Sequence, residues 1–496
     1  MYSSNTAKYQ VDNIPSPRQP NLTTENGIDL AYQSAEMRRV LLVSYSFPPN
    51  REMGAYTCAQ IARYLPMYGW RPIVLTVKEK YLEEQFPKHD GVDSLVEPDF
   101  VVRTAMLPHP LDIYRRFKSS SLTGKLFRAG NQQATSPNNA VGDKSTLGAK
   151  RSARDLLLSI LNLPDAHTGW LIPAVMTGLR AIKRTKAQAI YSSAPYFTNH
   201  LAGYALALLT GLPWVAHFRD PWVTGSPAEY CANDLYFRIN RALERMIVAR
   251  ADAVVCVTEE HAALMRAAYD QIPASKLAVV MNGFDGLEWE EAGEALAQSA
   301  HCQAGKPRKF RITYTGTLYM KRNPAPLFRA LRSLVDAGEI AREEVSVELI
   351  GWCESSEGRN VADLVVEAGL EECVSIIGPL NHLDTLSRLS QSDLLLLLAE
   401  GLVTQIPGKT FEYLKTHRPI LALTSEGSLA NLLRRTGGGW VINPSDHAGI
   451  VTAVRECYRS WKYKLPGRKP DSSVVESFDR RRTTGLIAEL LNSFAR

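Results

Sequence analysis

The chain lacks the cysteine patterns of a disulfide-rich or zinc-binding protein. Its seven cysteines lie far apart, without a C-x-x-C pair and without the Cys/His spacing of a metal site. Neither a disulfide framework nor a zinc site is indicated. A reducing, cytoplasmic setting fits this cysteine usage best.

Long apolar runs are also missing. No window reaches the roughly 18 apolar residues of a membrane-spanning helix, and the longest candidate, residues 201–218, is broken by Gly203, Gly211 and Pro213. It predicts a helix, a turn and a strand. Residues 1–37 are polar, without the apolar run of a signal peptide, and are expected to form a disordered leader.

Strong charge of either sign is absent. The net charge of +6 on 496 residues is mildly basic, which favours anionic ligands or an anionic membrane face and gives no indication of nucleic-acid binding. A chain of this length exceeds one ordinary core, so at least two domains are expected.

Buried-strand patterns alternate with helical patterns throughout the chain. Such alternation predicts parallel sheets with helices on both faces. The first half has its strand patterns at residues 38–46, 71–77, 187–193, 213–218, 251–258 and 277–282, and the second at 310–316, 345–351, 374–378, 392–399, 419–424 and 439–443.

The interpretation is α/β, with two doubly wound, Rossmann-like domains that face a central cleft. The expected domains are residues 38–285 and 308–470, with a linker at 286–307 that carries no strand pattern. Ligands of open α/β sheets bind at the carboxyl ends of the strands, so the loops there are the candidate site.

Residues 119–153 are rich in Ser, Gly, Asn and Lys and poor in large apolar residues. Such a composition cannot bury enough surface to order itself, which favours a mobile insertion. Joined to the preceding LDIYRRFKSS, it could instead form a basic patch for an anionic bilayer.

Two cationic loops stand out in the second half. In QIPGKTFEYL, Lys409 and Glu412 lie one turn apart at the start of a helix, whose free N–H groups attract anions. In TGTLYMKRNP, Gly316 follows a strand, with Lys321 and Arg322 close behind. Glycine permits close backbone approach and the cations can neutralise a phosphate, although a turn glycine and surface ion pairs are the alternative interpretation.

The motifs HFRDPW, GTLYMKRNP and IPGKTFEYLKTHRPIL, with their order and spacing over residues 38–470, resemble family 4 glycosyltransferases of bacterial polysaccharide pathways. The resemblance implies the GT-B fold and retaining transfer of a sugar from a nucleotide donor (UDP-, GDP- or similar), without metal or other cofactor. It also implies that the final helix, within residues 471–496, crosses back to the first domain.

The resemblance further implies residue roles. Glu412 would accept hydrogen bonds from the ribose hydroxyls, while Lys409 and Arg322 would hold the pyrophosphate near Gly408. Asp220 and Arg219 join Arg322 and Lys409 as candidate catalytic residues, with Asp220 orienting the acceptor. The full set of implied donor-binding residues is Gly54, Gly316, Thr317, Lys321, Arg322, Leu380, Gly408, Lys409 and Glu412.

Three positions depart from the family pattern. The acidic residue expected eight positions before Glu412 is Thr404, and the nearest acid is Glu400. The histidine that many members use beside the sugar falls at Arg219, while His217 stands where an acid is usual. Glu400, Thr404 and His217 are therefore candidate sugar contacts.

The resulting expectation is a glycosyltransferase of cell-surface polysaccharide synthesis that acts on a glycan or lipid-linked acceptor. It would be cytoplasmic or peripheral on the inner face of the cell membrane. Two alternatives stay open: a nucleotide-sugar epimerase, which needs no acceptor, and a non-catalytic nucleotide-sugar-binding partner, which the Thr404 departure favours.

Overall fold

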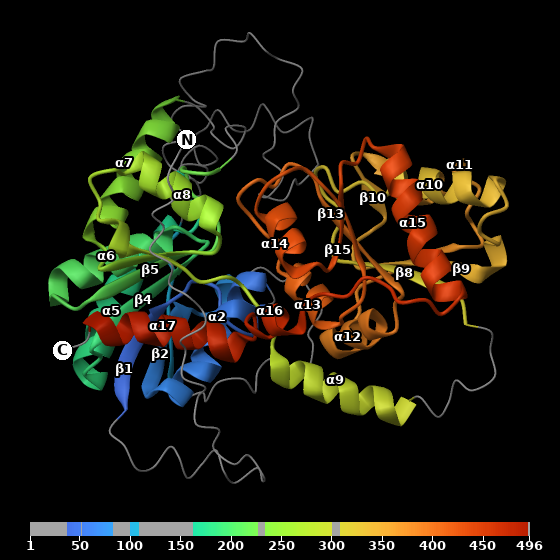
Figure 1. Ribbon diagram of the computed structural model, residues 1–496. Coiled ribbons are helices and arrows are strands. Elements are labelled where there is room, and N and C mark those ends of the chain that lie inside the picture. Colours follow the sequence, from blue (N-terminus) through green and yellow to red (C-terminus); the bar gives the residue numbers. More distant parts are fainter. Residues whose placement is uncertain are drawn as a thin grey trace, which may run out of the picture.

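The protein folds around two separate parallel sheets, each flanked by helices (Figure 1). The computed structural model describes residues 37–50, 52–82, 100–108, 162–226, 234–299 and 308–494. Residues 1–36 of the expected leader at 1–37, and the whole expected insertion at 119–153, lie outside these residues.

The N-terminal sheet has, within the described residues, seven strands in the order β3-β2-β1-β4-β5-β6-β7, all parallel. The side chains of its central strands are buried on both faces, as a covered parallel sheet requires. Its strands are β1 (Arg38–Val43), β2 (Trp70–Val77), β3 (Val101–Thr104), β4 (Ala189–Ala194), β5 (Trp214–Phe218), β6 (Ala253–Cys256) and β7 (Leu277–Val279).

Helices cover both faces of this sheet. Side chains of α5 and α6 pack into the core on one face, and side chains of α2 pack into the core on the other. The helices are α2 (Met53–Tyr64), α5 (Leu171–Thr185), α6 (Thr198–Thr210), α7 (Asp234–Arg250) and α8 (Glu259–Ala268), with 3-10 turns at Leu65–Tyr68, Glu79–Tyr81, Thr168–Trp170 and Ala274–Lys276.

The C-terminal sheet has six described strands in the order β12-β9-β8-β13-β14-β15, again all parallel. They are β8 (Phe310–Thr315), β9 (Val345–Ile350), β12 (Val374–Ile377), β13 (Leu394–Ala399), β14 (Ile420–Thr424) and β15 (Gly439–Ile442); a short hairpin pairs β10 (Ser355–Ser356) with β11 (Arg359–Asn360). Its helices are α10 (Ala325–Asp336), α11 (Val361–Glu367), α12 (His382–Ser390), α13 (Lys409–Lys415), α14 (Ser428–Thr436) and α15 (His447–Lys462), with a 3-10 turn at Arg342–Glu344.

Strand alternation separates the two C-terminal cores. Leu396 and Leu398 of β13 face the core beneath α10 and α15, whereas Leu395 and Leu397 face the core beneath α13 and α14. Successive side chains of a strand point to opposite faces. The position of a residue in β13 therefore determines whether its side chain faces α10 and α15 or faces α13 and α14.

The chain crosses between the two sheets twice at one place. Phe284 and Asp479 form a bridge, with the Phe284 N–H donating to the Phe478 carbonyl (3.2 Å) and the Arg480 N–H donating to the Phe284 carbonyl (2.8 Å). The outgoing crossing leads into α9 (Gly286–Ser299), and the returning one runs from α16 (Ser472–Glu476) into α17 (Arg480–Phe494).

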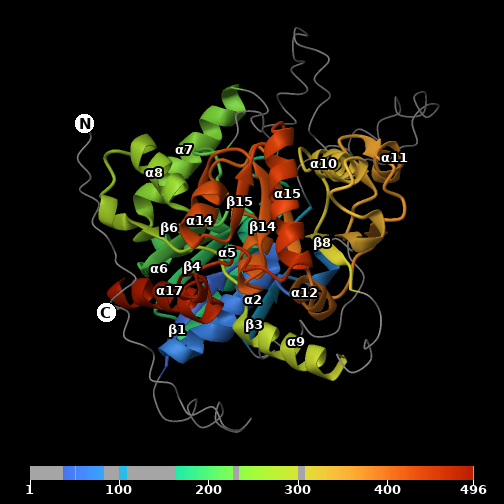
Figure 2. The ribbon, with the colours of Figure 1, turned by 45° about the vertical axis from the view of Figure 1, so that its right-hand side comes forward.

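Helix α17 lies against the N-terminal sheet beside α2 in both ribbon views (Figures 1 and 2). Ile487 and Leu491 are buried in the same core as α2, with Leu486 and Leu490 packed at its edge. The indole N–H of Trp70 donates to the Asn492 side chain at 2.9 Å. The last helix therefore completes the N-terminal core.

The α/β class with two doubly wound sheets is confirmed. The segment expected as a linker at 286–307 contains α9, and strand β3 was not expected from the sequence. No helix in the part of the chain that the structure describes has the length and apolar character to span a bilayer.

Candidate active site

Helix α13 presents Lys409 and Glu412 on one face, because its other face is buried. Phe411, Tyr413 and Leu414 pack into the core beneath the helix. The Tyr413 hydroxyl accepts a hydrogen bond from the Thr315 N–H at 2.9 Å. This bond fixes α13 against the end of β8, where the candidate phosphate loop begins.

Lys409 lies directly beside that loop. Its Nζ donates to the Thr315 carbonyl and stands 3.9 Å from the Tyr314 ring centroid. Burial lowers the pKa of Lys409 well below its ordinary value, and the positive charge of Arg322 lowers it further. An anion at this point would favour the charged form again, because an opposite charge offsets both effects.

Gly316 is required by both its backbone and its surroundings. Its φ of +112° lies in the region that favours glycine, and a Cβ there would stand 2.9 Å from the Lys409 Nζ. The structure thus places Gly316 directly beside Lys409.

Arg322 and Thr317 lie on the same loop. The Arg322 guanidinium stacks 4.0 Å from the Tyr319 ring centroid, and its Nη1 donates to the Thr317 carbonyl at 3.4 Å. The guanidinium is delocalised, and its stacked position leaves donors for a further partner.

Glu412 faces a cluster that the sequence did not indicate. Its Oε1 lies 3.7 Å from the Nε2 of His382, and that nitrogen lies 3.0 Å from the Oε2 of Glu288 on α9. Tyr56 of α2 makes an edge contact with the His382 ring, with centroids 5.6 Å apart. Elements of both domains therefore meet around Glu412.

The cluster shifts both titrating groups. Burial raises the pKa of Glu412, against the opposing charge of His382. Burial alone would lower the pKa of His382, but the hydrogen bond to Glu288 and the charge of Glu412 raise it to about 9. The raised pKa favours the cationic form of His382, whose Nε2 faces the Glu412 carboxyl group.

Arg219 and Gly54 pack together on the N-terminal side. The Arg219 Nε donates to the Ala194 carbonyl at 3.0 Å and its Nη1 to the Met53 carbonyl at 3.3 Å. A Cβ on Gly54 would stand 2.8 Å from the Arg219 Nη2, so any side chain there would displace the guanidinium. Met53 in turn lies against Gly408, where a Cβ would be 3.6 Å from its sulfur.

The loop before α13 bonds across to the N-terminal domain. The Gln405 Nε2 donates to the Asp220 Oδ1 at 2.7 Å. The Thr258 hydroxyl donates to the Thr404 carbonyl at 2.7 Å, and the Thr404 hydroxyl donates to the Gly225 carbonyl at 3.1 Å. Thr404 is 4% exposed, so the residue in place of the family's acid serves as an interdomain contact.

The remaining predicted residues are His217, Leu380, Glu400 and Lys321. His217 is 2% exposed and its Nδ1 hydrogen-bonds the Tyr191 hydroxyl inside the N-terminal domain. Leu380 is half-buried in the loop between β12 and α12. Glu400 and Lys321 line one pocket of about 250 Å³ with Leu398, on the sheet face away from α13.

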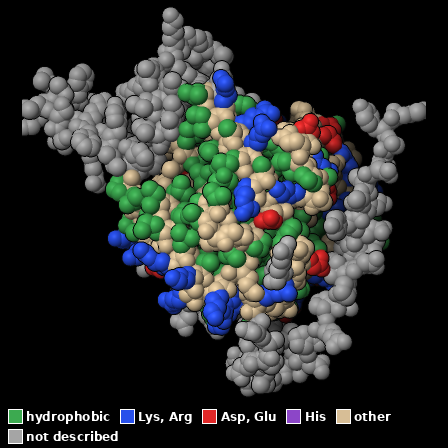
Figure 3. Space-filling model, turned by 90° about the vertical axis from the view of Figure 1, so that its left-hand side faces the viewer, with side chains coloured by type: hydrophobic (Ala, Val, Ile, Leu, Met, Phe, Trp, Pro, Cys, Tyr) green, Lys and Arg blue, Asp and Glu red, His purple; other side chains and the backbone are tan. Residues whose placement is uncertain are grey.

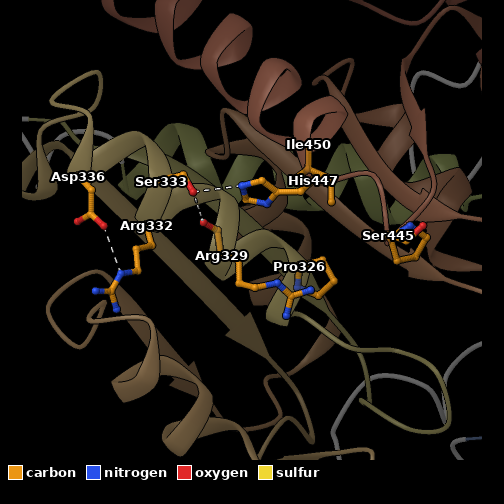
Figure 4. A pocket seen from close by; sticks show the side chains of 9 residues that line it. Pro326, Arg329, Arg332, Ser333, Asp336, Ser445, His447 and Ile450 are labelled. Atoms are coloured by element: carbon orange, nitrogen blue, oxygen red, sulfur yellow. Dashed lines mark hydrogen bonds and ion pairs between the residues drawn. The ribbon is translucent and has the colours of Figure 1, made fainter.

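A larger pocket, of about 470 Å³, lies between α10 and α15 (Figure 4). Four of its polar side chains are engaged in pairs: Ser333 contacts the His447 Nε2 at 3.1 Å, and Arg332 pairs with Asp336 at 3.3 Å. Neither Lys409 nor Glu412 lines it. Among the residues described, no group of three or more His, Cys, Asp or Glu side chains could hold a metal ion.

Known proteins share this architecture. Residues 143–283 match the family described as "Glycosyl transferase 4-like domain", and no curated protein sequence matches the chain. The chain is similar in structure to HepE of Anabaena in complex with UDP and glucose (16% identity, TM-score 0.57, 92% of this chain and 100% of that chain).

Two further solved structures are similar. Sucrose-phosphate synthase of Thermosynechococcus elongatus has 13% identity and a TM-score of 0.53, over 92% of this chain and 95% of that one. The UDP-GlcNAc 2-epimerase of Neisseria meningitidis, bound to UDP-GlcNAc, has 12% identity and a TM-score of 0.51, over 92% and 100%. At such identities the likeness establishes the fold, which is GT-B, and the domain match supplies the likeness to family 4.

Proposed function

We propose that this chain, a glycosyltransferase of the GT-B fold with a family 4-like domain, transfers a sugar from a nucleoside diphosphate sugar to a glycan or lipid-linked acceptor. The reaction would retain the anomeric configuration and need no metal. One observation carries the proposal: Lys409 and Glu412 share a face of α13, with Lys409 against Gly316 at the end of β8.

This placement suits the two halves of a nucleotide. The ammonium of Lys409 has three donors, of which the Thr315 carbonyl accepts one, so donors remain for a diphosphate oxygen. Arg322 adds a second cation on the same loop. The carboxylate of Glu412 can accept from both ribose hydroxyls, and such charge-assisted bonds are the strong ones.

In the proposed reaction the bond between the anomeric carbon and the diphosphate oxygen breaks, and the acceptor oxygen bonds to that carbon from the same side. The acceptor proton passes to a diphosphate oxygen, which balances the charge. Lys409 and Arg322 would stabilise the leaving diphosphate, because pre-placed cations act most strongly where negative charge develops. Asp220, held by Gln405, and Arg219 would orient the acceptor at the opposite side of the cleft.

Two other functions have specific support. The fold likeness to an epimerase supports a reaction on the donor alone. The engagement of Thr404 with the N-terminal domain, where the family has an acid, supports a binding protein without turnover. Acceptor-dependent release of nucleoside diphosphate separates the transferase from both.

The proposal extends to location. A lipid-linked acceptor of cell-surface polysaccharide would place the protein on the inner face of the cell membrane. The basic residues 112–153, which lie outside the described residues, are one candidate for this contact.

The deciding experiment is Glu412→Gln, measured by calorimetry with UDP and GDP. The variant keeps the shape but replaces charge-assisted bonds with neutral ones, so affinity for the preferred nucleotide should fall by about 1–3 kcal/mol. Glu426→Gln is the matched control, because Glu426 is an exposed residue whose one ion-pair partner among the described residues is Arg434. If the two variants bind the nucleotide with equal affinity, Glu412 does not contact the ribose, and the proposed donor site is refuted.

A further inference from the structure

The outer faces of α5 and α6 form one surface with an unusual composition, here called the α5–α6 surface. The two helices pack side by side on the same face of the N-terminal sheet. Gly178 permits the close fit, because a Cβ there would stand 2.9 Å from a Leu206 methyl group. The inner sides of both helices pack against the protein core, and no other helix or strand of the described residues covers their outer sides.

Large apolar side chains are exposed on these outer sides. Ile172 is 60% and Met176 is 51% exposed on α5, and Leu208 and Leu209 are each 62% exposed on α6. Figure 3 shows this side of the molecule, where hydrophobic side chains gather on the surface and Lys and Arg outnumber acidic groups. Exposed apolar side chains that gather on one face of a protein are a feature of interaction sites.

Basic side chains continue the α5–α6 surface along α5. Arg180, Lys183, Arg184 and Lys186 are exposed, and within the described residues none has a carboxylate partner. The sequence from residue 166 to 219 contains neither Asp nor Glu. These charges therefore have no acid on their own or the neighbouring helix to neutralise them.

Helix direction places some of the apolar groups and some of the basic groups at the same end of the α5–α6 surface. Helices that connect parallel strands run antiparallel to those strands, so α5 and α6 point the same way and their carboxyl ends lie at the same edge of the sheet. Lys183 and Arg184 on α5 and Leu208 and Leu209 on α6 share that end. A surface that combines apolar side chains with unpaired cations matches the acyl–headgroup boundary of an anionic bilayer.

We propose that the α5–α6 surface docks the protein on an anionic lipid bilayer. Ile172, Met176, Leu208 and Leu209 enter the headgroup region, and the four cations bind acidic headgroups. This surface is distinct from residues 112–153, and it stands apart from donor chemistry: a chain that binds vesicles but no nucleotide would fail only the proposed function.

The test is flotation of the full chain with vesicles of phosphatidylcholine alone and of equal parts phosphatidylcholine and phosphatidylglycerol. The wild type should float with the mixed vesicles at low salt and be released at high salt. At roughly fivefold for each unit of charge near the surface, Lys183→Glu/Arg184→Glu should weaken binding on the order of a hundredfold or more. Lys464→Glu/Lys469→Glu, with the same change in net charge on the C-terminal domain, should not.

The apolar part has its own pair of variants. Ile172→Gln/Leu208→Gln should weaken binding, whereas Val366→Gln/Leu465→Gln, at exposed apolar positions of the C-terminal domain, should leave it intact. Circular dichroism and UDP affinity verify that each variant is folded. Removal of residues 119–150 should leave binding largely in place.

Three outcomes overturn the proposal. If the wild type floats with neither kind of vesicle, the bilayer is not the partner, and an acidic protein becomes the candidate partner of the α5–α6 surface. If both charge-reversed double variants lose vesicle binding equally, the net charge of the protein determines binding and the α5–α6 surface has no specific role. Normal flotation of the α5–α6 variants, with loss on removal of residues 119–150, assigns the contact to that segment.

Discussion

Gly316→Ala tests the close approach of the β8 loop and Lys409. The substitution has two separable effects, a strained backbone at a φ of +112° and a Cβ that would stand 2.9 Å from the Lys409 Nζ. Because that nitrogen ends a flexible side chain, the lysine shifts and leaves the Thr315 carbonyl. The ammonium is then no longer positioned for a diphosphate.

The two effects have different magnitudes and different readouts. Backbone strain of an L-residue in this region costs about 1–2 kcal/mol, which lowers the melting temperature by about 2–4 °C for each kcal/mol in a domain of this size. Loss of a charge-assisted bond costs up to about 1.5–3 kcal/mol, or about ten- to a hundredfold in affinity for a nucleoside diphosphate.

Gly338→Ala is the matched control, since Gly338 has a φ of +68° and no atom within 4 Å of the added Cβ. It should lose stability as Gly316→Ala does, while nucleotide affinity by calorimetry stays unchanged. In a Lys409→Ala background, Gly316→Ala should cost no further affinity. Unaltered nucleotide binding in Gly316→Ala, or a full additional loss in the double variant, would refute the reasoning.

The remaining predictions use other parts of the molecule. Lys409→Ala should lower kcat more than it raises the donor KM, because the leaving group gains negative charge as its bond breaks; steady-state kinetics with donor and acceptor measure both. Deletion of residues 478–496 should lower the melting temperature strongly, because Ile487 and Leu491 leave the N-terminal core. The pKa of His382 is raised from 6.5 to about 9, so its stabilisation is complete below about pH 6.5 and lost as pH rises through 9. His382→Gln should therefore flatten the unfolding free energy measured between these pH values.

The strand patterns predicted most of the fold because a covered parallel sheet leaves continuous apolar runs. Residues 392–399 and 419–424 became β13 and β14 for this reason. Strand β3 was not predicted because it is an edge strand of four residues that is half-exposed along most of its length. An edge strand carries too little apolar patterning to stand out.

The candidate site was predictable where the residues are local in sequence, as with Lys409 and Glu412 on one helix turn. The contacts of Glu412 were not, because His382 and Glu288 come from different elements and meet it only through packing. The sequence offered one indication of His382: it lies two residues after Leu380, a predicted donor-binding residue, and is the first residue of α12. The pairing of Gln405 with Asp220 depends on the placement of two domains, which no local pattern encodes.

The double crossing at Phe284 and Asp479 affects the order in which the chain can be completed. The N-terminal domain is discontinuous in sequence, since its core needs α17 from the end of the chain. During synthesis the N-terminal domain leaves the ribosome before the C-terminal domain, but its core cannot be completed until α17 has also left the exit tunnel. By then all residues of the segment between the two crossings have been released. The domain that is synthesised first is thus the last to be finished, with part of its apolar surface uncovered until then.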